Sequence, residues 1–65
     1  MNIEIIPERE NDFLKIFMIT RNGQEIAFLK IYLENNDWYI RFSHELVDID
    51  TMSEVLEKVK QFKGD

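Results

Sequence analysis

The sequence has 65 residues, no cysteine, one histidine, 45% hydrophobic residues and a formal net charge of −5. These values exclude disulfides, leave no basis for a structural zinc site, and argue against an overall basic nucleic-acid binder. The apolar content indicates one folded domain over residues 1–65, and without a membrane-length apolar run or a basic leader segment we expect it to be cytoplasmic.

The chain begins with a short apolar segment that is followed by a charged one. Residues 2–6 alternate at Ile3 and Ile5 before Pro7, a pattern typical of an edge strand that stops at the proline. Ile3, Ile5 and Ile6 could instead fold over part of one face of a sheet that the later segments build. We expect residues 7–12, which are mostly charged, to form a solvated loop.

Three segments rich in Ile, Phe, Tyr and Leu come next. They contain no proline or glycine and predict three strands, over residues 13–20, 25–34 and 38–44. Asn22-Gly23 lies between the first two and favours a type I′ turn, because both central residues of that turn need positive φ. Asn35-Asn36 is a weaker turn signal between the second and the third.

The last third of the chain predicts a helix over residues 51–63. Its apolar side chains recur at three- and four-residue steps, at Met52, Val55, Leu56, Val59 and Phe62. Asp50 or Thr51 can cap its start, Thr51 and Glu54 match a capping box, and Gly64 is expected to end it. The predicted fold is therefore α+β, with an antiparallel sheet of three or four meandering strands and one C-terminal helix packed on one face.

The two turns assign the side chains of the strands to faces. The first turn pairs Phe17 with Phe28 across a regular hairpin, and the second puts Trp38 opposite Leu33. The face that we expect the helix to cover has no charge at its centre. It comprises Leu14, Ile16, Met18, Leu29, Ile31, Leu33, Trp38, Ile40 and Phe42.

The second face of the predicted sheet mixes aromatic and basic side chains. Lys15, Lys30 and Arg41 would lie at one level across three strands, where like charges disfavour the sheet unless water, an anion or a carboxylate screens them. Extended apolar surface on a small protein is typical of interaction sites. We therefore expect a partner to bind at Lys15, Phe17, Phe28, Lys30, Tyr32, Tyr39 and Arg41.

The sequence offers no constellation of catalytic or metal-ligating residues. Asp48 and Asp50 resemble the start of a calcium loop, but the glycine that such a loop needs at its sixth position is missing. Ser43 and His44 are neighbours on a predicted strand, so their side chains project to opposite faces. We expect no enzyme activity, no metal, no cofactor and no small-molecule substrate.

The expected function is that of a small non-enzymatic protein-binding module. It would act as a regulatory or inhibitory protein of the phage or mobile-element type, through the aromatic and basic face, on another protein or on a second copy in a homodimer. The alternative is a nucleic-acid-binding module that uses Lys15, Lys30 and Arg41 together with the aromatic side chains. The acidic balance of the chain disfavours this alternative.

Overall fold

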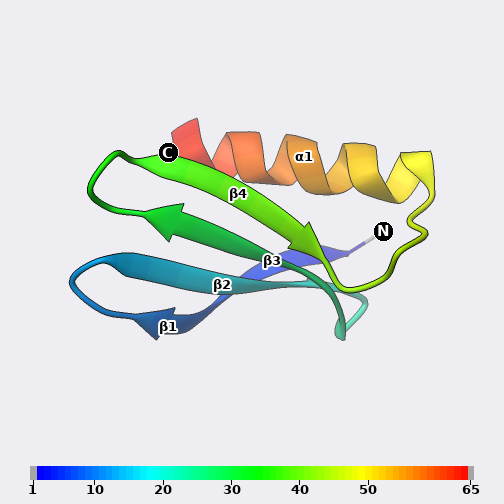
Figure 1. The fold of residues 1–65 in the computed structure, drawn as a ribbon. Coiled ribbons are helices and arrows are strands. Elements are labelled where there is room, and N and C mark those ends of the chain that lie inside the picture. The colour runs from blue at the N-terminus through cyan, green and yellow to red at the C-terminus, as the bar shows by residue number, and fades with distance from the viewer. Residues whose placement is uncertain (1, 65) are drawn as a thin grey trace.

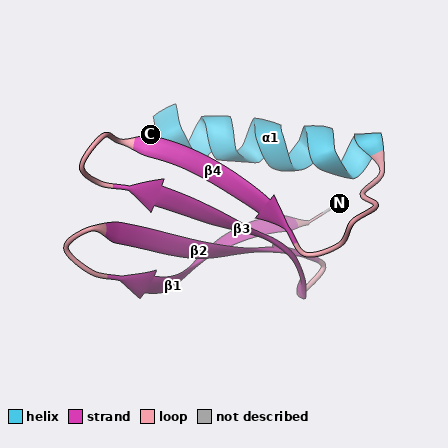
Figure 2. Ribbon diagram, in the orientation of Figure 1, coloured by secondary structure: helices cyan, strands magenta, loops and turns pink. Residues whose placement is uncertain are grey.

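The computed structural model describes residues 2–64 and has the expected α+β fold. Four antiparallel strands follow one another in chain order across one open sheet, and a single helix covers one face of it (Figures 1 and 2). The elements are β1 (Ile3–Glu10), β2 (Leu14–Arg21), β3 (Gln24–Tyr32), β4 (Asp37–Phe42) and α1 (Ile49–Gly64). Within this described part, no helix is long and apolar enough to cross a membrane.

The edge strand β1 is longer than the sequence predicts, because Pro7 lies inside it. The Asn22 N–H donates to the Asn2 carbonyl at 2.9 Å. Hydrogen-bonded residues alternate along an antiparallel pair, so the even-numbered residues up to Ile6 bond to β2 and the odd-numbered ones direct their backbone groups outward. Pro7 is odd-numbered, so its nitrogen, which carries no hydrogen, points away from β2. The strand then continues past a bulge between Pro7 and Arg9. The edge-strand alternative is thus correct. The expected loop over residues 7–12 is wrong for residues 7–10, which belong to β1.

The hairpin between β2 and β3 has the predicted turn but not the predicted register. Asn22 and Gly23 both have positive φ, at 53° and 83°, as a type I′ turn requires. Just beyond the turn, the register shifts because Ile26 is an extra residue in β3, so Ile19 pairs with Ala27. Residues 14–19 of β2 therefore turn their side chains to the face opposite to the predicted one.

The hydrophobic core lies between the sheet and α1. Its buried members are Ile3, Ile19, Ala27, Leu29, Ile31, Val55 and Val59, and Phe17, Ile26, Trp38, Ile40 and Phe42 pack against them. The prediction is confirmed for the core side chains of β3 and β4. It is wrong for Leu14, Ile16 and Met18, which the β-bulge places on the other face, and Phe17 and Ile19 take their place.

The connection between β3 and β4 is longer than the predicted two-residue turn. Because β3 ends at Tyr32, Trp38 pairs with Ile31 rather than with Leu33. This shift of two residues keeps every side chain on its predicted face. Leu33, which the sequence places in the core, lies beyond the strand end and is 39% exposed.

Helix α1 begins at Ile49, two residues earlier than predicted, and Asp48 is its N-terminal cap. The Asp48 carboxylate accepts hydrogen bonds from the Thr51 N–H at 3.0 Å and from the Thr51 hydroxyl at 2.7 Å. The expected cap at Asp50 or Thr51 is therefore wrong. The Thr51 hydroxyl also accepts a hydrogen bond from Nη1 of Arg21 at 2.8 Å, which ties the end of β2 to the first turn of the helix.

The helix packs on the sheet through a narrower stripe than the sequence predicts. Val55 and Val59 are buried as expected, whereas Met52 and Leu56 are 37% and 42% exposed. The Phe62 ring is partly exposed and packs edge-to-face on Phe17 and on Trp38. Gly64 is still helical, so its expected role in ending the helix falls at the limit of the described residues.

Candidate functional site

The sheet face opposite α1, which we call the open face, is not covered by any element of the described chain (Figure 1). Side chains from all four strands form it, because the strand pairing places partners on the same face. They include Glu4, Ile6, Leu14, Ile16, Met18, Phe28, Lys30, Tyr32, Tyr39 and Arg41. The structure thus brings together five of the seven predicted partner-binding residues, namely Phe28, Lys30, Tyr32, Tyr39 and Arg41.

The other two predicted partner-binding residues, Lys15 and Phe17, lie on the helix-covered face. Nζ of Lys15 forms an ion pair with Oε1 of Glu10 at 3.2 Å, and the Phe17 ring packs on Phe62 with 5.1 Å between centroids. The β-bulge places Lys15 opposite Ile31 instead of Lys30. The structure therefore lacks the predicted row of three cations, whose mutual repulsion would have disfavoured the regular hairpin.

The residues that the prediction missed make the centre of the open face apolar. Met18 lies between Ile6 on β1 and Phe28 on β3, so these three side chains form a row across three strands. Met18 and Phe28 are half-buried and Ile6 is exposed. At one end of the face, the rings of Tyr32 and Tyr39 pack edge-to-face, with centroids 5.6 Å apart. We call Ile6, Met18 and Phe28 the apolar row.

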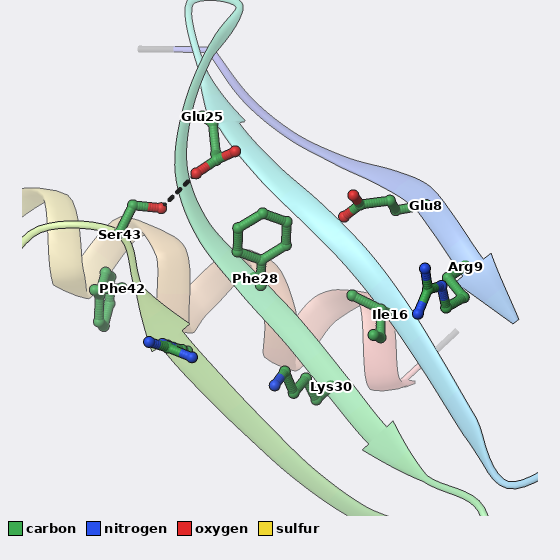
Figure 3. A pocket seen from close by; sticks show the side chains of 9 residues that line it. Glu8, Arg9, Ile16, Glu25, Phe28, Lys30, Phe42 and Ser43 are labelled. Carbon is green, nitrogen blue, oxygen red and sulfur yellow. Dashed lines mark hydrogen bonds between the residues drawn. The ribbon is translucent and has the colours of Figure 1, made fainter.

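A shallow hollow of about 570 Å³ opens beside Phe28 (Figure 3). Its walls carry the basic Arg9, Lys30 and Arg41 and the acidic Glu8 and Glu25. The Ser43 hydroxyl donates a hydrogen bond to Oε2 of Glu25 at 2.8 Å, which holds this carboxylate at one end of the hollow. Across residues 2–64, no carboxylate lies within ion-pair distance of Lys30 or Arg41. Two cations beside an apolar row are thus free to meet a carboxylate from outside.

The open face offers apolar contact area and charged side chains. The structure places no three of the described His, Asp and Glu side chains where they could hold a metal ion together. The basic and acidic side chains of the hollow nearly balance, so the face combines apolar contact area with directional charges. Comparisons with family models, curated proteins and solved structures found no match for the chain.

Proposed function

We propose that this protein is a small non-enzymatic binding module whose open face receives a partner protein. The observation that carries the proposal is the apolar row of Ile6, Met18 and Phe28 in the middle of an uncovered sheet face. When one face of an antiparallel sheet is solvated, it normally carries polar side chains. A contiguous apolar surface in that position is typical of a protein–protein interface.

The charges beside the apolar row indicate the chemistry of the partner. Lys30 and Arg41 lie on neighbouring strands at the hollow, with no ion-pair partner in the described chain. A partner segment that carries apolar side chains next to a carboxylate would fill the hollow and neutralise these cations. Tyr32 and Tyr39 belong to the residue types that dominate binding energy at interfaces, and they extend the contact area.

Such a module would change a partner's activity by occupying its surface, so its role would be regulatory or inhibitory. A nucleic acid is a weaker candidate for the open face than the sequence alone suggested. Lys15 is absent from the face, and Glu8 and Glu25 share the hollow with its cations. These carboxylates repel phosphates at the place where the basic side chains would attract them.

The proposal is tested by capturing partners from a nuclease-treated extract of the organism that encodes the protein. We expect a protein that is retained by the wild type and by Lys60→Glu, but not by Arg41→Glu. The two variants change charge equally, and Lys60 is exposed on the helix, away from the open face. With the purified partner, Arg41→Glu should weaken binding by roughly tenfold or more. Equal binding by both variants would contradict a role for the open face.

A second measurement separates a protein partner from a nucleic acid. Single-stranded and double-stranded oligonucleotides are titrated with the wild type and with Lys30→Glu at low and at moderate salt. The proposal predicts no salt-sensitive binding, because the cations and carboxylates of the hollow offset each other. Tight binding that weakens steeply with salt and is lost in Lys30→Glu would favour the nucleic-acid alternative instead.

A further inference from the structure

The two edges of the sheet differ in how they are protected from pairing with another strand. β1 contains Pro7, a bulge and the charged neighbours Glu8 and Arg9, and all of these features block edge-to-edge pairing. β4 contains no proline or glycine, and its pairing with β3 has no bulge. Only Asp37 and Arg41 are charged among its six residues. The β4 edge therefore has none of the usual protection except one charge of each sign.

The backbone groups that β4 leaves unpaired follow from its pairing with β3. The Ser43 N–H donates to the Ile26 carbonyl at 2.9 Å. Because hydrogen-bonded residues alternate in an antiparallel pair, the odd-numbered residues of β4 direct their N–H and C=O groups toward β3. Trp38, Ile40 and Phe42 turn their N–H and C=O groups outward. No other segment of the described chain pairs with this edge, because β4 is the last strand of the sheet.

The sequence of β4 is complementary to itself when two copies run antiparallel. With Ile40 opposite Ile40, every outward N–H and C=O of Trp38, Ile40 and Phe42 gains a partner. On the helix side, Trp38 then lies opposite Phe42. On the open face, Arg41 lies opposite Tyr39 and diagonal both to Asp37 and to Arg41 of the second copy, so it gains a ring and a carboxylate to contact beside one like charge. No like charges face each other directly in this register, although the chain as a whole is acidic.

Exposed apolar side chains on α1 border the same edge. Nζ of Lys63 lies 5.2 Å from the centroid of the Trp38 ring on β4. Leu56 and Met52 precede Lys63 by two and three helical turns, so they lie on the same side of the helix. Both are partly exposed. A two-fold axis between paired β4 strands would turn these sides of the two helices toward each other.

We infer that β4 pairs with β4 of a second copy, which joins two sheets into one continuous sheet of eight strands. The two helices then lie on one side of this sheet, and the two open faces combine on the other. The homodimer thus forms through the sheet edge rather than through the open face. It leaves the apolar row and Lys30 of each open face available to the partner of the proposed function, whereas Tyr39 and Arg41 border the contact between the two copies. A dimer would present two such faces together.

The inference is tested first on the wild-type chain in solution. Sedimentation equilibrium from micromolar to submillimolar concentration should show a dimer. In the dimer, the amides of Trp38, Ile40 and Phe42 should exchange slowly with deuterium, while the outward amide of Ile5 on β1 exchanges fast. A monomer throughout this range would overturn the inference. A dimer in which the three β4 amides exchange as fast as that of Ile5 would overturn it as well, because such a dimer uses another surface.

A backbone change then tests the pairing without altering any side chain. Chemical synthesis of the full chain allows N-methylation of Ile40, which removes one outward donor and blocks the approach of a second strand. We expect dimerisation to weaken by roughly tenfold or more, with an unchanged circular dichroism spectrum. The matched control is N-methylation of Ile5 on the other edge, which should leave the dimer intact. A dimer that survives N-methylation of Ile40 would overturn the inference, whatever the outcome for the open face.

Discussion

The helix-covered face and the open face of the sheet are both rich in apolar side chains, but only the first is closed. The contrast is sharpest along β2, where Phe17 and Ile19 pack under α1 while Ile16 and Met18 lie on the open face. Both sets are strongly hydrophobic, so their composition does not decide which set forms the core. One extra residue, Ile26, decides it through the register. In a strand that is apolar on both sides, the pairing assigns one set to the core and leaves the other set uncovered.

Truncation of two neighbouring residues on β2 should separate the two faces most strongly. Ile19 is fully buried, so Ile19→Ala should lower the free energy of unfolding by roughly 2–5 kcal/mol. Met18 lies on the open face and is half-buried, so Met18→Ala should cost about 1 kcal/mol or less. Urea unfolding measures both values. If Met18→Ala lowers the free energy of unfolding more than Ile19→Ala does, the regular hairpin register, without the bulge, is the correct one.

The sequence predicts those features of the fold that rest on local periodicity or on turn chemistry. The type I′ turn, the strands β2 to β4, the core side chains of β3 and β4, and the buried Val55 and Val59 are all confirmed. Each depends on residues close together in the chain. The β-bulge at Ile26 does not, because it depends on how two strands share a core with a helix. The predicted clash of Lys15 with Lys30 was the signal that the regular register was unfavourable.

The candidate site was predicted where it depended on β3 and β4 and missed where it depended on β2 and β1. Phe28, Lys30 and Tyr39 lie on the open face because their strands keep the predicted faces. The face of Met18 depends on the bulge in β3, and the face of Ile6 follows from its pairing with Met18. The helix cap was missed for a simpler reason. Thr51 and Glu54 match the capping-box pattern, in which the Glu54 carboxylate would accept from the Thr51 N–H. In the structure that N–H donates instead to the carboxylate of Asp48, which lies one turn earlier in the chain.

The attachment of α1 to the covered face can be weakened at Thr51. This buried side chain accepts a hydrogen bond from Arg21 and donates one to Asp48. Thr51→Val keeps the shape and removes both bonds, so it should lower the free energy of unfolding by about 1–3 kcal/mol. Ser53→Ala, an exposed position in the same turn, is the control and should have almost no effect. Equal effects of the two variants would mean that the link between β2 and α1 contributes no stability.

The turn that sets the β2–β3 hairpin should respond to a smaller change. Gly23 has a φ of +83°, a conformation that costs an L-residue about 1 kcal/mol or slightly more. A Cβ at this position meets no atom within 4 Å, so Gly23→Ala should show this backbone cost alone. Gly64→Ala is the matched control, because Gly64 is helical and alanine favours a helix. Thermal unfolding should therefore shift downward only for Gly23→Ala, and equal shifts would contradict the left-handed turn.

The smallest expected effect is the pH dependence of the helix cap that closes the covered face. The hydrogen bond from the Thr51 hydroxyl, followed by that from the Thr51 N–H, lowers the pKa of Asp48 from its ordinary value of 3.8. The unfolded chain therefore binds a proton at Asp48 at a higher pH than the folded chain does. The resulting stability is complete above the unfolded pKa and is lost as the pH falls through the folded pKa.

A comparison of the wild type with Asp48→Asn isolates this contribution, because asparagine keeps a capping oxygen but carries no charge. The difference between their unfolding midpoints in urea should stay constant from neutral pH to about pH 5 and then shrink below the ordinary pKa. Asp50→Asn is the control, since Asp50 takes no part in the cap, and its difference should change less over the same range. A wild-type advantage that persists undiminished at about pH 2 would show that the carboxylate charge does not stabilise the cap, and that the oxygen alone holds the first turn of α1 over the core.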